Sequence, residues 1–134
     1  MIREATFIDR PAIKKLMQSE EGFWQDSWHD DVIDHGIKSA YKLAFVWEES
    51  NQVVGFICAH DLGFRVYLSE LIVDKSVRRK GIGKKLVRKI EDELTTKGRT
   101  VLISDVWRDA AGFYKNLGWS EPDVILMRKI LRRK

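Results

Sequence analysis

The sequence has 134 residues, 44% of them hydrophobic and 33% charged, which is the composition of a globular protein rather than of a disordered or membrane-spanning chain. Its 24 Lys and Arg exceed its 20 Asp and Glu, and the net charge of +4 favours an anionic ligand or partner. Cys58 is the single cysteine, which excludes an internal disulfide. The length predicts one domain, residues 1–134, and the acidic residues near the amino terminus argue against a signal peptide, so we expect a cytoplasmic protein.

The amino-terminal part of the chain predicts a strand followed by two helices. Residues 2–7 alternate in the manner of a strand, and Asp9 can cap a helix that carries Pro11 in its first turn. A second, short helix is expected to end near Ala40, with Trp28, Val32 and Ile33 as the residues that can turn inward.

The middle of the chain predicts a hairpin, a central strand and a long helix. Residues 41–48 and 53–60 read as antiparallel strands, and the apolar run 66–73 reads as the central strand. The following helix ends near Gly98, and its apolar residues recur every fourth position: Ile82, Leu86, Ile90 and Leu94.

The last part predicts a strand over residues 100–106, a short helix over 109–116 and a final strand over 124–130. Strands and helices in these numbers predict an α/β (α+β) fold, a mixed sheet with helices on both faces.

The turn between the central strand and the long helix is basic and contains two glycines. Amide N–H groups in the first turn of a helix lack intrahelical partners, and glycine lets an anion approach them closely. We therefore interpret the turn as an anion cradle; the alternative is an ordinary glycine-containing turn with a solvated basic face. The spacing excludes a P-loop and a dinucleotide fingerprint. The turn reads Arg78, Arg79, Lys80, Gly81, Ile82, Gly83 and Lys84.

Two motifs together resemble the GNAT N-acetyltransferase superfamily. The first is Val73-Asp74-x-x-x-Arg78-x-x-Gly81-x-Gly83, and the second, later in the chain, is Phe113-Tyr114-x-x-Leu117-Gly118-Trp119. The resemblance implies a GNAT-like, mostly antiparallel sheet, with acetyl-CoA as co-substrate and no metal. It also implies cofactor-binding residues: Leu71, Ile72 and Val73 on the central strand, and Arg78, Arg79, Lys80, Gly81, Ile82, Gly83 and Lys84 in the turn.

The resemblance further implies that Tyr114 is the general acid that protonates the leaving thiolate. A phenol has a pKa near 10 and holds its proton at neutral pH. The alternative is a helix tyrosine packed beside Phe113 with no role in catalysis.

Glu70 is the candidate general base. Strict alternation places it on one face with Val66, Leu68 and Ile72, where apolar neighbours raise a carboxyl pKa; a bulge would alter this parity, and a salt-bridged glutamate is the alternative.

Two residues depart from the family pattern. The polyamine-acetylating branch carries a carboxylate at the position of Ser69 as well as at that of Glu70. Many members carry a cofactor-binding asparagine where this chain has Trp107.

Acidic residues dominate the segment from Glu20 to Asp34, and aromatic residues lie among them. We expect this segment either to border the acceptor site and select cationic amines or to be a solvated surface. His29, His35 and His60 have no metal-ligand spacing, so no metal site is predicted, and Cys58 reads as a core residue.

The sequence thus predicts an N-acetyltransferase that moves acetyl from acetyl-CoA to an amine by direct attack in a ternary complex. Two alternatives remain: a non-catalytic acyl-CoA-binding sensor, and a small basic nucleic-acid-binding module. The acceptor is a small-molecule amine or a protein amino group. Nucleic acid is the less favoured partner, no membrane partner is expected, and a homodimer is left open.

Overall fold

The computed structural model describes residues 1–132 of the chain. The chain divides into two compact units, residues 1–104 and residues 105–134, and each is described by itself. The single domain expected from the length stays a prediction.

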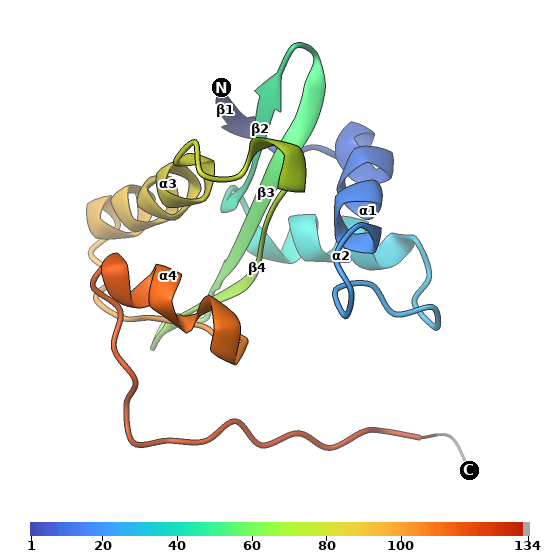
Figure 1. Cartoon of the computed structure of the whole chain (residues 1–134). Coiled ribbons are helices and arrows are strands. Elements are labelled where there is room, and N and C mark those ends of the chain that lie inside the picture. Colours follow the sequence, from blue (N-terminus) through green and yellow to red (C-terminus); the bar gives the residue numbers. More distant parts are fainter. Residues whose placement is uncertain (133–134) are drawn as a thin grey trace. The chain divides into compact units, whose positions relative to one another are not determined.

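The first unit is built on a five-stranded sheet whose strands lie side by side in chain order (Figure 1). Strands β1 to β4 pair antiparallel, and β5 pairs parallel to β4. This confirms the mixed, mostly antiparallel sheet expected from the sequence. The strands are β1 (Ile2–Glu4), β2 (Ala44–Glu49), β3 (Gln52–Asp61), β4 (Val66–Val73) and β5 (Leu102–Ile103).

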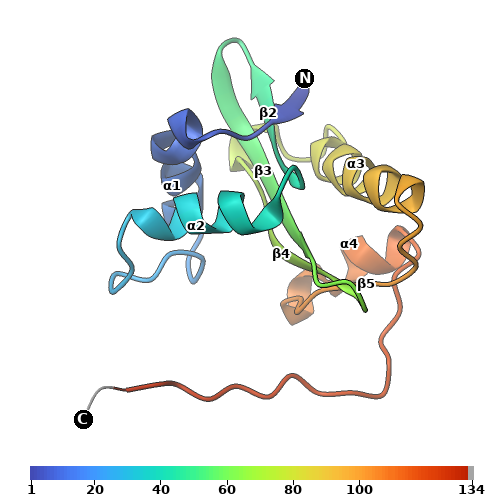
Figure 2. The ribbon, with the colours of Figure 1, turned by 180° about the vertical axis from the view of Figure 1, so that it is seen from behind.

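Helices cover both faces of this sheet, as expected. Helices α1 (Arg10–Gln18) and α2 (Asp31–Ala40) lie on one face, and α3 (Ile82–Thr96) lies on the other (Figures 1 and 2). The core lies between these layers, because apolar side chains of the strands are buried on both faces.

Helix α3 packs on the sheet through the apolar stripe that its sequence predicts. The side chains of Leu86 and Ile90 are completely buried. A Cβ atom at Gly55 of β3 would lie 3.1 Å from Leu86 Cδ1 and 3.3 Å from Ile82 Cγ2. Glycine at position 55 therefore lets the amino-terminal part of α3 approach the sheet closely, which fixes where that helix begins.

The amino-terminal half departs from expectation in one detail. Trp28 precedes α2, and Trp28 and Val32 are each 36% exposed, so the prediction that they point inward is wrong. Ile33, the third residue expected to turn inward, is buried. The ring of Trp28 instead meets that of Trp24 edge to face at 5.4 Å, which satisfies part of its apolar surface locally.

The carboxyl-terminal part of the chain has fewer strands than predicted. Strand β5 spans two residues rather than 100–106, and residues 124–130 form neither helix nor strand. The side chains of Ile125 and Met127 are exposed. A segment of residues that favour β structure becomes a strand only when a neighbouring strand supplies hydrogen bonds. The sequence pattern of the segment does not show whether such a neighbour is present. The second unit contains a 3-10 turn (Arg108–Ala110) and α4 (Ala111–Asn116).

A buried carboxylate ties the start of α1 to the first strand. Asp9 is 5% exposed and accepts hydrogen bonds from Arg3 Nη1 and Nη2 at 2.9 and 2.8 Å and from the Thr6 amide at 2.9 Å. The same guanidinium reaches Glu48 of β2 at 3.0 Å. The hydrogen bonds from Arg3 hold the pKa of Asp9 below its ordinary value.

We expect Asp9→Asn to lower the free energy of unfolding at pH 7 by about 1 to 3 kcal/mol, because it weakens charge-assisted hydrogen bonds to a buried group. The pKa of Asp9 is depressed by folding, so its contribution is present above the unfolded pKa and is lost as the pH falls through the folded pKa. Urea unfolding at pH 7 and pH 3 measures both effects. Asp26→Asn, at an exposed position, is the control; equal stability of the two variants at pH 7 would contradict this role.

Candidate active site

The glycine turn leaves the amino terminus of α3 without a side-chain cap. Gly81 is the N-cap residue with φ +78°, a left-handed conformation that favours glycine, and no side chain hydrogen-bonds to the cap. The first intrahelical bond runs from the Lys85 amide to the Gly81 carbonyl at 3.0 Å. The amides of Ile82, Gly83 and Lys84 therefore lie at the positions where a helix has N–H groups without carbonyl partners.

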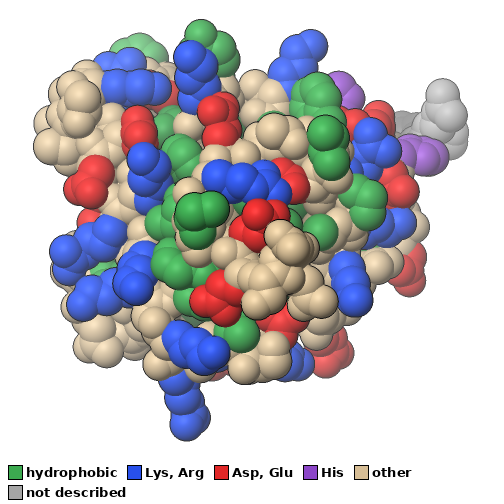
Figure 3. All heavy atoms as spheres, turned by 90° about the horizontal axis from the view of Figure 1, so that it is seen from above, with side chains coloured by type: hydrophobic (Ala, Val, Ile, Leu, Met, Phe, Trp, Pro, Cys, Tyr) green, Lys and Arg blue, Asp and Glu red, His purple; other side chains and the backbone are tan. Residues whose placement is uncertain are grey.

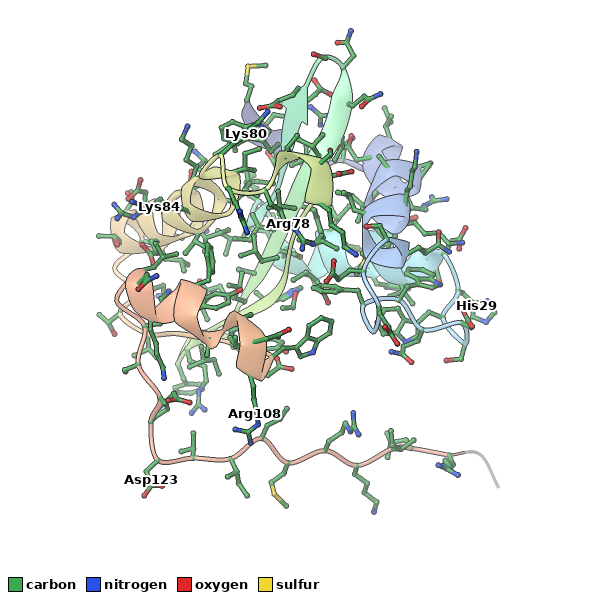
Figure 4. All side chains as sticks on the ribbon, viewed as in Figure 1. His29, Arg78, Lys80, Lys84, Arg108 and Asp123 are labelled. Atoms are coloured by element: carbon green, nitrogen blue, oxygen red, sulfur yellow. The ribbon has the colours of Figure 1, made fainter. Side chains whose placement is uncertain are left out.

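The space in front of this turn is open and positively charged. A Cβ atom at Gly81 would meet no heavy atom within 4 Å, and Arg79 also has a positive φ of 72°. Lys80 lies on the turn and Lys84 in the first turn of α3, both exposed (Figure 4). Open space, unpartnered amides and cations together fit a pyrophosphate group.

Arg78 is held by the protein itself. Its Nε donates to the Val73 carbonyl at 3.0 Å, and its Nη2 lies 2.6 Å from Glu20 Oε2. These bonds join the end of β4 to the segment after α1. The geometry thus gives Arg78 a part in shaping the turn, and its predicted contact with the cofactor stays a prediction.

Strand β4 has an open edge beyond its first two residues. The pairing with β5 joins Val66 to Leu102 and Tyr67 to Ile103. The Ser104 hydroxyl then donates to the Leu68 carbonyl at 2.8 Å. Among the described residues, β5 pairs with no later residue of β4, so the two strands part near the middle of β4.

The hydrogen-bonding direction along β4 shows which residues face this edge. The Asp74 amide donates to the Val54 carbonyl of β3 at 2.8 Å, so by antiparallel alternation Ile72 also directs its N–H and C=O toward β3. Leu71 and Val73 direct theirs toward the open edge. Of the three strand residues expected to bond a cofactor through their backbone, Leu71 and Val73 therefore face the open edge, and Ile72 does not.

A bulge in β4 changes the face on which Glu70 lies. Cys58 of β3 is opposite Glu70, and the next residue, Ala59, is opposite Leu68, so Ser69 has no opposite residue. Directly opposite residues share a face, which puts Glu70 with Cys58 on the face covered by α2 and Leu68 on the other face. The expected grouping of Glu70 with Val66 and Leu68 is wrong for this reason, and its grouping with Ile72 is retained.

Three of the six acids in the segment from Glu20 to Asp34 pair with Lys or Arg side chains of other elements: Glu20, Asp30 and Asp34. Asp34 accepts from Arg10 Nε and Nη2 at 3.0 and 2.7 Å, and Asp30 accepts from Lys14 Nζ at 2.7 Å. Both cations lie on α1, outside the acidic segment itself. Asp30 and Asp34 thus join α1 to α2 and have little net charge left to attract a cationic acceptor.

Tyr114 lies in α4 of the second unit between two aromatic rings. Its ring meets those of Phe113 and Trp119 edge to face, with centroids 5.1 Å apart in each pair. Burial raises the pKa of the Tyr114 phenol to about 12. The phenol therefore keeps its proton across the physiological range, as a proton donor requires.

Residues 1–132 contain no cluster of three or more His, Cys, Asp or Glu side chains that could hold a metal ion. A shallow hollow lined by Glu91, Leu94 and Thr95 lies toward the carboxyl end of α3, away from the glycine turn.

Comparison with known proteins identifies the family. The model of the acetyltransferase (GNAT) family matches residues 10–119, which is most of the chain. The chain belongs to the GNAT acetyltransferase family. Membership supports acetyl transfer as the general class of activity.

Solved structures share the fold of this GNAT chain. A protein described as a transcriptional regulator from Bacillus halodurans C-125 has a TM-score of 0.81 and 17% identity over 97% of this chain and 99% of its own. The ribosomal-protein-S18-alanine N-acetyltransferase of Escherichia coli has a TM-score of 0.79 and 23% identity over 91% and 78%. The PaiA N-acetyltransferase of Thermoplasma acidophilum, solved in complex with coenzyme A, has a TM-score of 0.74 and 18% identity over 93% and 92%.

One group of polar residues in this GNAT chain was not found from the sequence. His60 of β3 lies between two serines: its Nδ1 is 2.9 Å from Ser39 Oγ of α2, and its Nε2 is 2.7 Å from Ser69 Oγ of β4. The sequence offered only a histidine without metal-ligand spacing. The pairing of β3 with a bulged β4 brings His60 and Ser69 together. The register of this pairing cannot be predicted from the two residues in the sequence.

Proposed function

We propose that this chain is an acetyl-CoA-dependent N-acetyltransferase in which an amine attacks the thioester directly within a ternary complex. The observation that supports this most strongly is the uncapped, glycine-bounded start of α3 directly after a strand with an open edge. A long anionic cofactor has a charged end and an extended arm. The amides of α3 and the cations at one end of β4 suit the charged end, and the backbone groups along the open edge of β4 suit the arm.

In this proposal the pyrophosphate lies against the amides of residues 82–84, with charge supplied by Arg79, Lys80 and Lys84. The pantetheine arm adds to the open edge of β4, where Leu71 presents its N–H and C=O and Val73 presents its N–H, since the Val73 carbonyl already accepts from Arg78. The thioester then lies near the bulge at Ser69, beside Glu70.

Glu70 and Tyr114 divide the proton transfers. An alkylammonium has a pKa near 10.4, so at neutral pH it must lose a proton before its nitrogen can attack. Glu70 attracts the ammonium and accepts this proton, and the Tyr114 phenol donates a proton to the departing thiolate. Both residues are proposed to act directly at the reacting groups.

The acceptor in this proposal is a primary amine, carried by a small molecule or by a protein amino group. Among residues 1–132, no helix is both long enough and apolar enough to cross a membrane.

The basic run from Lys75 to Lys89 favours this reading over a nucleic-acid-binding module, because several of its cations already have partners. Arg78 pairs with Glu20, Lys85 lies over the Trp47 ring and Lys89 pairs with Glu93. On the face shown in Figure 3, Lys and Arg side chains lie among Asp and Glu rather than in a continuous basic band.

We expect Glu70→Gln to lower the rate of acetyl transfer about tenfold at pH 7 and to recover part of it at pH 9, because free amine is then more abundant. Initial rates across this pH range with a saturating amine measure the effect. Glu91→Gln, on α3, is the control. A rate deficit that stays constant from pH 7 to pH 9 would contradict a role in deprotonation.

Thiol release on mixing the protein with acetyl-CoA and a panel of amines tests the proposed function. We expect amine-dependent release of CoA. Binding of acetyl-CoA with no release for any amine would favour a sensor, and tight binding of duplex nucleic acid at physiological salt without CoA binding would favour the nucleic-acid alternative.

A further inference from the structure

Acetylation of an ammonium group requires two proton acceptors. The nitrogen of an alkylammonium loses one proton to become nucleophilic, and it loses a second after the C–N bond forms and its charge returns. Glu70, in the proposed function on which this inference rests, accounts for the first proton only. The departing thiolate takes up one proton from Tyr114, and an acceptor on the amine's side of the thioester lets the nitrogen lose its second proton before the C–S bond breaks.

Ser39, His60 and Ser69 form a hydrogen-bonded chain on the face of the sheet that also carries Glu70. Four bonds make up the chain. His60 Nε2 lies 2.7 Å from Ser69 Oγ and His60 Nδ1 lies 2.9 Å from Ser39 Oγ. Ser69 Oγ lies 3.2 Å from the Cys58 carbonyl, and Ser39 Oγ lies 3.2 Å from the Gly36 carbonyl.

A neutral imidazole cannot supply all four bonds. Each serine hydroxyl contributes one proton and a neutral His60 contributes one, so three protons serve four bonds. An imidazolium donates from both nitrogens, to Ser39 and Ser69, and both hydroxyls are then free to donate to the carbonyls. Proton uptake by His60 therefore completes the network, which is the property that a proton acceptor needs.

The surroundings of Nε2 indicate which nitrogen takes the proton. Nε2 faces two groups that can donate: the Ser69 hydroxyl and, at 3.6 Å, the Cys58 thiol. Burial raises the pKa of Cys58 to about 12, so the thiol keeps its hydrogen. The Ser69 hydroxyl has one proton and lies nearer to Nε2, at 2.7 Å, than to the Cys58 carbonyl, at 3.2 Å, so we assign Nε2 as the acceptor in neutral His60 and Nδ1 as the nitrogen that donates to Ser39.

Burial keeps His60 neutral before the reaction, and its titratable neighbours are few. Beside it on β3 is Cys58, and on β4 are Glu70, on the shared face, and Tyr67, whose ring is stacked at 6.5 Å; α2 presents the Ser39 hydroxyl. His60 is half-buried, and burial lowers its pKa below the ordinary value of about 6.5. It is therefore mostly unprotonated at pH 7 and available to accept.

We propose that Ser69 and His60 together accept the second proton from the substrate nitrogen. As the C–N bond forms, the nitrogen becomes cationic and transfers its proton to Ser69 Oγ, while the original Ser69 hydroxyl proton moves to His60 Nε2. The C–S bond then breaks and the sulfur keeps its electron pair, which Tyr114 protonates. The imidazolium and the Glu70 carboxyl then release their protons to solvent and the Tyr114 phenolate takes one up, so one proton is released per turnover. Ser69 touches the substrate, whereas His60 acts through Ser69.

We expect His60→Gln and Ser69→Ala each to lower kcat about 10²-fold at pH 8, the usual value for an acid–base group, with CoA affinity unchanged. The ratio of wild-type to His60→Gln rates should shrink as the pH falls through the pKa of His60, because protonated His60 cannot accept. His35→Gln, an exposed histidine of α2, is the control. A merely structural His60 would give a ratio that does not vary with pH.

The imidazole nitrogen shifts of ¹⁵N-labelled wild-type protein test the same inference without turnover. We expect the Nδ1–H tautomer for neutral His60 and a titration that moves in Ser69→Ala; an Nε2–H tautomer would overturn the inference. If wild type releases thiol and His60→Gln equals it, this inference fails and the proposed function stands. If wild type releases no thiol with any amine, the proposed function fails first and the inference with it.

Discussion

We expect Tyr114→Phe to lower kcat by about 10² to 10⁴, the contribution of a general acid, while the affinity for CoA stays near that of wild type. Burial raises the pKa of the Tyr114 phenol to about 12, so the group is protonated at neutral pH and is available as a donor. Removal of one oxygen atom leaves the ring, and hence its contacts with Phe113 and Trp119, in place.

Steady-state kinetics at saturating acetyl-CoA, with single-turnover rates to establish that chemistry limits kcat, measure this effect. Tyr41→Phe is the matched control, since Tyr41 is 71% exposed at the end of α2. A Tyr114→Phe enzyme with full kcat under these conditions would make Tyr114 a packing residue of α4.

We expect Gly81→Val to weaken CoA binding by about 10² to 10⁴, which corresponds to the loss of two charge-assisted hydrogen bonds between helix amides and phosphate. A β-branched residue at φ +78° is strained and would rotate the start of α3, and its side chain would occupy the open space before the amides. Gly83→Val is expected to act in the same direction, by placing a side chain among those amides.

Calorimetric titration with CoA measures this change. Gly63→Val is a matched control, because Gly63 also has a positive φ, +85°, and open space around its Cβ position, but lies in the loop between β3 and β4. It should carry a similar backbone strain and leave CoA affinity intact. Equal affinities of Gly81→Val, Gly83→Val and wild type would remove the anion cradle.

The parts of the fold that were predicted correctly are those with a local sequence pattern. The apolar stripe of α3, the hairpin of β2 and β3 and the central β4 are confirmed because each has its own periodicity and its own turn residues. The final strand over 124–130 was predicted wrongly, since its apolar residues carry no information on whether a partner strand is beside them.

The candidate site likewise has one part that could be predicted from the sequence and one part that could not. The glycine turn was predictable because its chemistry lies within a few consecutive residues, and the structure places a left-handed Gly81 at the start of α3. The bulge at Ser69 was not, because a bulge depends on the pairing of two strands. That bulge moved Glu70 to the face of α2 and brought Ser69 to His60, so the residues that we propose as proton acceptors were the ones that the sequence placed least well.

Ion pairs between elements could not be predicted from the sequence, because they too depend on how distant segments pack together. The acidic segment from Glu20 to Asp34 contains no Lys or Arg, which suggested a surface for cations. Its partners Arg10 and Lys14 lie on α1, and Arg78 lies in the glycine turn, so only the fold shows that three of its six acids are paired.

Transfer of a deuterated acetyl group, followed by mass spectrometry of both the amine and the protein, distinguishes direct transfer from an acetylated enzyme. We expect the amine to gain the labelled acetyl group in proportion to the CoA released, and the mass of the chain to stay unchanged throughout. Label that accumulates on the protein before it reaches the amine, or CoA release with no labelled amine, would contradict direct transfer in a ternary complex.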